Sequence, residues 1–245
     1  MREEVVISGG NGFLGSYLTK ALSRTYKVYC LDINLKNSVK NKYIVNVKCD
    51  ITNPSELKEK LGFIKKRKGI IHLINNAAID SVPKDLNSYK HIKLDLIKHL
   101  AVSLHGSQNL IEFFAKKMCA NKYGSIINVG SDLSVIAPNQ EVYSGVYKNF
   151  KKSMDYSVIK HGMIGLNKYF AALYAKNNIR VNMVSPAPIK NKQKKKLILN
   201  LKKIIPMKKL AEREDVFEMI YFLLSKKSKF ITGQNILIDG GRSII

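Results

Sequence analysis

The chain has 245 residues, of which 45% are hydrophobic, so it can bury a large core, and we expect one domain spanning residues 1–245. The net charge of +24 would attract anions, but the lysines are spread along the whole chain and no basic stretch alternates with stacking aromatic residues. No apolar run reaches about 18 residues. Nucleic acid, a membrane span and a signal peptide are therefore not expected. Cys30, Cys49 and Cys119 lack metal-ligand spacing, which predicts no metal site and a cytoplasmic protein.

The amino-terminal segment predicts a dinucleotide site. Residues 4–8 form a β-branched apolar run, typical of a buried parallel strand, and a helix is expected to follow to about residue 24. Between them lies a glycine-rich turn that would let a pyrophosphate approach the helix. We expect the turn to bind the dinucleotide through Gly9, Asn11, Gly12, Phe13, Leu14 and Gly15. A second strand, residues 27–31, ends in Asp32, whose carboxylate would accept hydrogen bonds from the adenosine ribose and repel a 2'-phosphate, which favours NAD over NADP.

Three more strands are predicted in the next hundred residues. Residues 43–49 lead to Asp50 and Ile51, expected beside and under the adenine, and Asn53 begins a helix over 54–66. A strand over 69–74 runs into Asn75, Asn76 and Ala77, where small residues allow close approach of a ligand. Residues 85–120 are expected to be mostly helical, as two helices or as one broken near residue 93. Residues 124–130 form a strand that ends at Ser131.

The carboxyl-terminal half adds two helices and two strands. Residues 131–156 are expected to be a loop over the site, followed by a helix to about residue 176 and a strand over 179–184. Ser185 and Pro186 are expected to break the chain, and residues 187–209 hold nine lysines and no acidic residue. A helix over 212–224 and a strand over 235–238 precede Asp239, Gly240 and Gly241.

Tyr156 and Lys160 lie one helical turn apart, so their side chains can converge. A phenol titrates near 10 in water, and a neighbouring ammonium group would stabilise its phenolate for proton transfer. By itself this spacing occurs by chance on many helices.

The alternation of strands and helices predicts an α/β fold, a Rossmann-type doubly wound parallel sheet of about seven strands with helices on both faces. Several candidate residues would end strands and so meet at one edge of this sheet. They are Gly9, Asp32, Asp50, Asn75, Ser131 and Pro186. Their co-location predicts one site.

These motifs resemble the short-chain dehydrogenase/reductase family along essentially the whole chain. The resemblance rests on residues 156–166, on residues 179–186 and on the segment from Phe230 to Gly241. It implies that Tyr156 is the general acid-base, that Lys160 holds the nicotinamide ribose and lowers the pKa of the tyrosine, and that Ser131 hydrogen-bonds the substrate oxygen. It further implies that Asn75, Ala77 and Ile189 help to hold the dinucleotide.

The chain departs from the family pattern at three places. Phe13 stands where compact members have glycine, Ser103 stands where the family has an asparagine of the proton relay, and Ala187 and Asn191 replace glycine and threonine. Ser103 remains a candidate catalytic residue, although a serine at this position argues against the usual proton relay through Lys160.

The resemblance leaves three functions open. The leading hypothesis is an NAD(H)-dependent oxidoreductase acting on a polar or anionic sugar, because residues 75–80 and 135–143 resemble a flagellin-modification and surface-sugar subgroup. Lysines of a substrate lid, residues 187–209, would then face a phosphorylated or nucleotide-linked sugar. The alternatives are a 3-oxoacyl-carrier-protein reductase and a non-catalytic dinucleotide-binding regulatory protein. The family also implies a homodimer or homotetramer.

Overall fold

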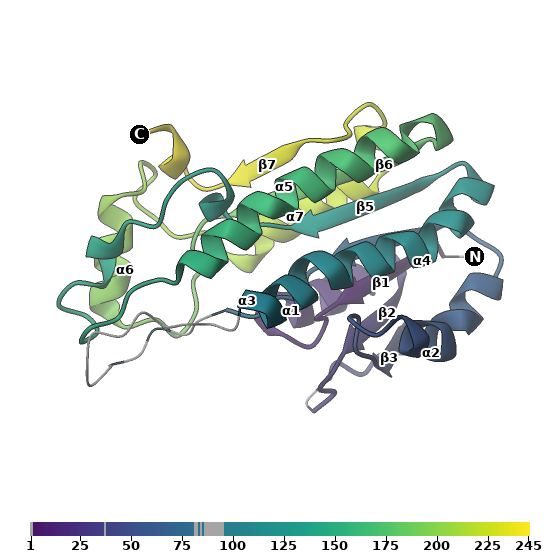
Figure 1. Ribbon diagram of the computed structural model, residues 1–245, viewed down its shortest axis with the longest axis horizontal. Coiled ribbons are helices and arrows are strands. Elements are labelled where there is room, and N and C mark those ends of the chain that lie inside the picture. Colours follow the sequence, from purple (N-terminus) through teal and green to yellow (C-terminus); the bar gives the residue numbers. More distant parts are fainter. Residues whose placement is uncertain (1, 37, 81–82, 84, 86–95) are drawn as a thin grey trace.

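The computed structural model describes residues 2–36, 38–80, 83, 85 and 96–245. Seven parallel strands form one sheet in the order β3-β2-β1-β4-β5-β6-β7 (Figure 1). The strands are β1 (Glu4–Ser8), β2 (Lys27–Asp32), β3 (Ile44–Lys48), β4 (Ile71–Asn75), β5 (Gly124–Val129), β6 (Ile179–Pro186) and β7 (Asn235–Ile238). The predicted doubly wound sheet is therefore confirmed.

Helices cover both faces of the sheet (Figure 1). The helices are α1 (Phe13–Leu22), α2 (Pro54–Lys66), α3 (Leu96–Leu100), α4 (Gly106–Asn121), α5 (Met154–Tyr174), α6 (Lys195–Lys203) and α7 (Arg213–Leu224). Side chains of α2, α4 and α5 share one buried apolar cluster with the sheet, and side chains of α1 and α7 share the other. Each face of the sheet thus buries its own core, and the parallel pairing of all strands brings their carboxyl ends to one common edge.

Local sequence signals explain where the helices begin. The Asn53 side chain accepts hydrogen bonds from the backbone N–H groups of Ser55 and Glu56, with Pro54 in the first turn. Before α7, Glu212 and Asp215 form a reciprocal capping box. Both helices start within a residue of the predicted positions.

The chain between strands differs from the predictions in three ways. Strand β6 does not stop at Val184 but runs through Pro186, because Ser185 and Pro186 pair with Leu237 and Ile238 of β7. A π-helical turn, Ala101–His105, interrupts the helical segment before α4, whereas the break predicted near residue 93 lies outside the described residues. The segment 187–209 contains α6, which packs through its leucines on the loop before α5.

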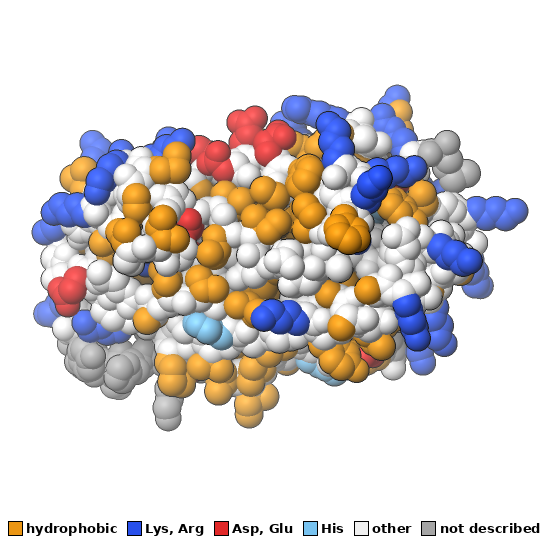
Figure 2. Space-filling model, turned by 90° about the horizontal axis from the view of Figure 1, so that it is seen from above, with side chains coloured by type: hydrophobic (Ala, Val, Ile, Leu, Met, Phe, Trp, Pro, Cys, Tyr) orange, Lys and Arg blue, Asp and Glu red, His pale blue; other side chains and the backbone are white. Residues whose placement is uncertain are grey.

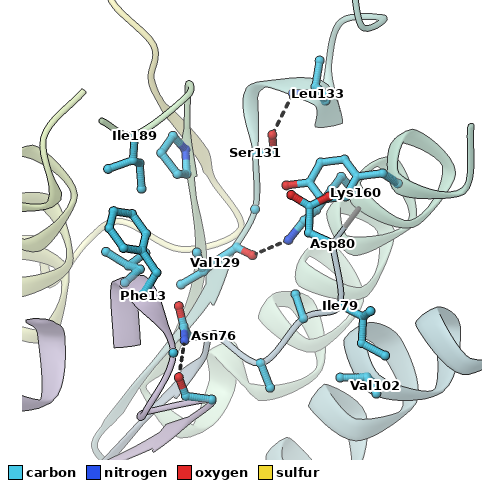
Figure 3. A pocket seen from close by; sticks show the side chains of 18 of the residues that line it. Phe13, Asn76, Ile79, Asp80, Val102, Val129, Ser131, Leu133, Lys160 and Ile189 are labelled. Carbon is cyan, nitrogen blue, oxygen red and sulfur yellow. Dashed lines mark hydrogen bonds between the residues drawn. The ribbon is translucent and has the colours of Figure 1, made fainter. Parts of the chain in front are cut away.

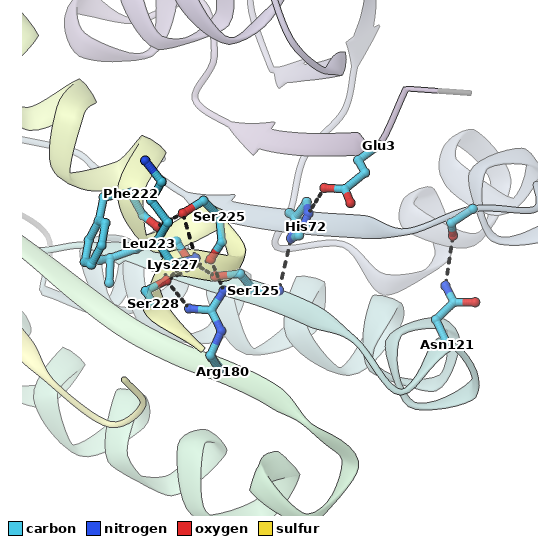
Figure 4. Close-up of polar contacts among 11 residues, drawn as sticks. Glu3, His72, Asn121, Ser125, Arg180, Phe222, Leu223, Ser225, Lys227 and Ser228 are labelled. Atoms are coloured by element: carbon cyan, nitrogen blue, oxygen red, sulfur yellow. Dashed lines mark hydrogen bonds and ion pairs between the residues drawn. The ribbon is translucent and has the colours of Figure 1, made fainter. Parts of the chain in front are cut away.

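Polar residues at the opposite edge of the sheet form hydrogen bonds between strands and loops (Figure 4). The Ser125 backbone N–H donates to His72 Nδ1 at 3.1 Å, so Nε2 carries the proton and faces Glu3 Oε2 at 3.0 Å. Arg180 donates to Ser228 Oγ at 2.8 Å. None of these residues lines the cavity described below. In the described part of the chain, no helix combines the length and apolarity needed to cross a bilayer.

Candidate active site

A cavity of about 800 Å³ lies at the carboxyl ends of the strands. Most of the residues predicted from the sequence line it: Gly9, Gly12, Phe13, Leu14, Asp32, Asp50, Ile51, Ala77, Ser131, Tyr156, Lys160, Pro186 and Ile189. Figure 3 shows that Phe13 and Ile189 lie on one side and that Ser131, Lys160 and Asp80 lie on the other. One hollow thus joins the glycine turn to the Tyr156–Lys160 pair.

The glycine turn holds the start of α1 open toward the cavity. Gly9 has a φ of +61°, and a Cβ on Gly15 would lie 2.0 Å from the Gly9 carbonyl oxygen, so the turn closes only around glycine. Gly12 caps α1 without a side-chain hydrogen bond, and the backbone N–H of Ser16 makes the first helical bond, to Gly12 at 2.9 Å. The N–H groups of the first turn are therefore free to bind an anionic phosphate.

Asp32 is fixed at the end of β2 by two backbone donors. The N–H of Asn11 donates to Asp32 Oδ2 and the N–H of Asn34 donates to Oδ1, both at 3.0 Å. Asp50 is held in the same manner, since Oδ1 accepts the Thr52 N–H at 2.9 Å and the Thr52 hydroxyl at 2.7 Å. Both carboxylates keep further acceptor capacity toward a ligand in the cavity.

Tyr156 and Lys160 project from α5 toward the end of β5. Lys160 Nζ donates to the Val129 carbonyl oxygen at 3.0 Å and lies 5.6 Å from the centre of the Tyr156 ring. Burial lowers the pKa of Lys160 to about 8, against an opposing effect of Asp80. Burial, and then the Asp80 carboxylate, raise the pKa of Tyr156 above its ordinary value. The lowering of the tyrosine pKa by Lys160 stays a prediction, because the two largest influences on this pKa are burial and Asp80.

Asp80 and Lys152 form a second charged pair beside Tyr156, which the sequence did not indicate. Lys152 Nζ lies 4.0 Å from the centre of the Tyr156 ring and makes an ion pair with Asp80. Gln140 accepts the Lys152 backbone N–H at 2.9 Å and donates to its carbonyl oxygen at 3.1 Å, which fixes the lysine backbone. The partners are 72 residues apart, so no local pattern predicts their meeting.

Four predicted residues do not line the cavity. The Asn75 side chain turns toward β5 and donates to Asn128 Oδ1 at 2.9 Å, whereas Asn76 lines the cavity and its amide braces Gly9 (Figure 3). The remaining three are Asn11, Gly15 and Ser103. Asn11 and Gly15 instead stabilise the glycine turn, Asn11 through its N–H bond to Asp32 and Gly15 through its close packing on the Gly9 carbonyl group. Ser103 is buried in the π-helical turn, where its carbonyl oxygen accepts the Ser107 hydroxyl at 2.7 Å.

The segment 187–209 contributes an apolar and amide surface to the cavity. From residues 187–209 the cavity is lined by Ala187, Pro188, Ile189, Asn191, Gln193, Leu197 and Leu201. All nine lysines of this fully described segment are exposed, and none of them lines the cavity. The segment is amphipathic, because Leu197 and Leu201 pack inward and the lysines of α6 face solvent. A contact between these lysines and an anionic substrate therefore stays a prediction.

The described residues offer no metal site. No group of three or more histidine, cysteine or acidic side chains within them could hold an ion. Burial raises the pKa of the Cys30 and Cys49 thiols to about 11, so both stay protonated near neutral pH.

A Rossmann-type sheet with a glycine turn and a tyrosine–lysine pair defines a dinucleotide-dependent oxidoreductase. A family model described as enoyl-(acyl carrier protein) reductase matches residues 32–243. 3-Oxoacyl-[acyl-carrier-protein] reductase FabG of Buchnera aphidicola subsp. Baizongia pistaciae is 31% identical, over 96% of this chain and 95% of that protein. Post-translational flagellin modification protein A of Campylobacter coli is 30% identical, over 97% of this chain and 96% of that protein.

Solved structures agree with these relatives. A short chain dehydrogenase from Leptospira borgpetersenii with bound NAD+ superimposes with a TM-score of 0.86 and 29% identity, covering 99% of this chain and 93% of that one. ElxO with NADP bound gives a TM-score of 0.83 and 27% identity, covering both chains fully, at 100% each. The chain belongs to the short-chain dehydrogenase/reductase family. It is an NAD(P)-dependent oxidoreductase acting on CH–OH groups.

Proposed function

We propose that the protein uses NAD(H) to interconvert a secondary alcohol and a ketone on a polar or anionic sugar of surface-glycan biosynthesis. The observation that carries the proposal is the joining of Asp32, Ser131, Tyr156 and Lys160 in one cavity. The flagellin-modification relative supports the sugar.

The residues of the site would divide the work as follows. The start of α1 would bind the pyrophosphate, Asp32 and Asp50 the adenosine end, and Ala77, Pro186 and Ile189 the remainder of the dinucleotide. The bound dinucleotide supplies the hydride acceptor in oxidation and the hydride donor in reduction. Tyr156 would take the alcohol proton as the carbinol hydrogen leaves as hydride, and return a proton to the oxygen in the reverse direction.

The fixed carboxylate of Asp32 supports NAD over NADP. A 2'-phosphate placed at the end of β2 would meet this anion, whose oxygens are already oriented by two backbone donors. Asp32→Ala is expected to weaken NADH binding about tenfold or more and to leave NADPH binding unchanged or stronger, as measured by nicotinamide fluorescence. Equal or better use of NADP by the unmodified protein would refute the preference.

A 3-oxoacyl-carrier-protein reductase is the second candidate, favoured by the relative from Buchnera. A panel of aldohexoses, sugar phosphates, nucleotide sugars and acetoacetyl-coenzyme A, followed at the absorbance band of reduced nicotinamide, separates the candidates. Turnover of acetoacetyl-coenzyme A alone would select the reductase. Tight NADH binding without any turnover would instead favour a non-catalytic regulatory protein.

The catalytic assignment has a matched control on the same helix. Tyr156→Phe removes only the hydroxyl and is expected to lower kcat by a factor of about 100 to 10,000 while NADH affinity stays the same. Tyr169→Phe makes the same change at a side chain of α5 that is 64% exposed, and is expected to leave both unchanged. Retained activity in Tyr156→Phe would contradict the assignment.

The proposal includes the organisation of the chain: one dinucleotide-binding domain, with residues 187–209 as substrate lid, in a cytoplasmic homodimer or homotetramer. Apolar side chains gather between lysines and arginines on the face shown in Figure 2. Exposed apolar residues of α5 include Met154, Val158, Tyr169 and Leu173. Association would cover such a surface. Analytical ultracentrifugation tests the oligomer.

A further inference from the structure

The carboxyl-terminal turn places a buried arginine in the substrate end of the cavity. Asp239 Oδ1 accepts the N–H of Gly241 at 2.9 Å and Oδ2 accepts the N–H of Ser243 at 2.8 Å, while Gly241 has a φ of +86°. This turn carries Arg242, which lines the cavity although its side chain is only 7% exposed. The Asp239-Gly240-Gly241 motif therefore positions the Arg242 guanidinium beside the site.

Asp132 links this arginine to the candidate catalytic serine. Arg242 Nη1 donates to Asp132 Oδ2 at 2.6 Å, and the Ser131 hydroxyl donates to Asp132 Oδ1 at 3.0 Å. The Leu133 N–H donates to the same Oδ1 at 2.8 Å and to Ser131 Oγ at 3.2 Å, a bond drawn in Figure 3. Both members of the ion pair are buried, so solvent does not compete for these bonds.

This network decides where the single proton of Ser131 points. A hydroxyl group has one proton and two lone pairs, and here the proton is directed at Asp132. The Leu133 N–H occupies one lone pair of the serine oxygen, which leaves the other lone pair as an acceptor in the cavity that Ser131 shares with Tyr156. A serine in this state can accept a hydrogen bond from an alcohol or a phenol, and its hydroxyl must turn away from Asp132 before it can donate a hydrogen bond to a ketone oxygen.

We infer that Asp132 and Arg242 are positioning residues that set the orientation of the Ser131 hydroxyl during the reaction. The Asp132 carboxylate accepts the hydrogen bond of the Ser131 hydroxyl. The Arg242 guanidinium withdraws charge from this carboxylate and so weakens that hydrogen bond, which allows Ser131 to donate to the substrate oxygen instead. The inference rests on the proposed function. A purely structural reading, in which the pair only ties the carboxyl terminus to the loop after β5, makes different predictions.

The test replaces the ion pair by apolar residues of similar size. Asp132→Leu/Arg242→Met leaves no buried unpaired charge, and such replacements commonly preserve folding. In the Ser131 background this double variant is expected to lower kcat about tenfold with KM within about twofold, using the panel compound that the unmodified enzyme turns over fastest. In the Ser131→Ala background the same replacement is expected to change kcat less than about twofold.

Two further variants separate positioning from folding. Arg242→Lys keeps a cation and is expected to recover most of the kcat lost in Arg242→Met. Arg67→Met removes an arginine from another buried carboxylate, Glu4 at the opposite edge of the sheet, where Nε lies 2.7 Å from Oε1. It is expected to lower the Tm without lowering kcat. An equal loss of kcat in both serine backgrounds, or no loss in either, would overturn the inference.

A readout without turnover keeps this test separate from that of the proposed function. In crystal structures with NADH, Ser131 is expected to hold one rotamer in the unmodified protein and to populate others once Asp132 and Arg242 are replaced. An unchanged single rotamer in the double variant would overturn the inference. Failure of the whole panel with the unmodified protein would count against the proposed function, while the rotamers would still decide the role of the pair.

Discussion

Replacing Asp80 by asparagine should move the pH dependence of alcohol oxidation to lower pH. Oxidation needs Tyr156 as phenolate, so kcat/KM rises with pH through the pKa of this tyrosine in the enzyme before the alcohol binds. The Asp80 carboxylate disfavours a second negative charge and raises that pKa. Its loss lowers the tyrosine pKa, and it leaves the Lys152 ammonium unpaired beside the ring, which acts in the same direction.

The size of the shift follows from the arrangement of the three groups. The Lys152 ammonium lies 4.0 Å from the Tyr156 ring centre and makes the ion pair with Asp80. Two unit charges roughly 6 Å apart interact by roughly 0.7 to 2.8 kcal/mol for an effective dielectric constant between about 80 and 20. Because the Asp80 side chain is 51% exposed, the lower half of this range applies, which corresponds to about one pH unit.

The assay is the pH profile of kcat/KM for oxidation, measured with the panel compound that shows turnover, from about pH 6 to about pH 11. Asp80→Asn should move the inflection down by about one unit. Glu218→Gln makes the same chemical change at an exposed position of α7 and should leave the profile in place. An unchanged profile for Asp80→Asn, or a shift to higher pH, would refute the electrostatic account of Tyr156.

Two further changes test the framework that holds the site. Gly15→Ala should destabilise the fold by about 1–3 kcal/mol and weaken NADH binding, because its Cβ would lie 2.0 Å from the Gly9 oxygen. A Cβ on Gly62 of α2 would have nothing within 4 Å, so Gly62→Ala should stabilise the fold by about 0.5–1 kcal/mol. Phe114→Ala leaves a cavity at a fully buried position and should lower the free energy of unfolding, measured in urea, by about 3–5 kcal/mol. Phe230→Ala changes a fully exposed side chain and should change that free energy by less than about 0.5 kcal/mol. Equal effects within either pair would contradict the packing described.

The sheet could be predicted from the sequence because its signals are local. A buried parallel strand is a short β-branched apolar run, and a helix start is marked by a residue such as Asn53, whose side chain caps the next N–H groups. The limits of β6 needed the tertiary structure. Pro186 at its end has no N–H to donate, yet it pairs with Ile238 of β7, a neighbour that no local pattern reveals.

The segment 187–209 shows the same limit. The sequence shows its lysines, but whether their side chains face solvent or the cavity depends on which face of α6 packs on the loop before α5. The structure turns Leu197 and Leu201 toward that loop and leaves the lysines in solvent, because burying leucine is favourable and burying an unpaired ammonium is costly.

By itself the sequence determined the sheet, the glycine turn, and the Tyr156–Lys160 spacing, which is a property of one helical turn. Only the tertiary structure decided which charges surround the tyrosine. The Lys152–Asp80 pair spans 72 residues and the Arg242–Asp132 pair spans 110. Side chains so far apart in the chain meet only when strands and loops are brought to one edge of the sheet, where these two pairs lie beside Tyr156 and Ser131.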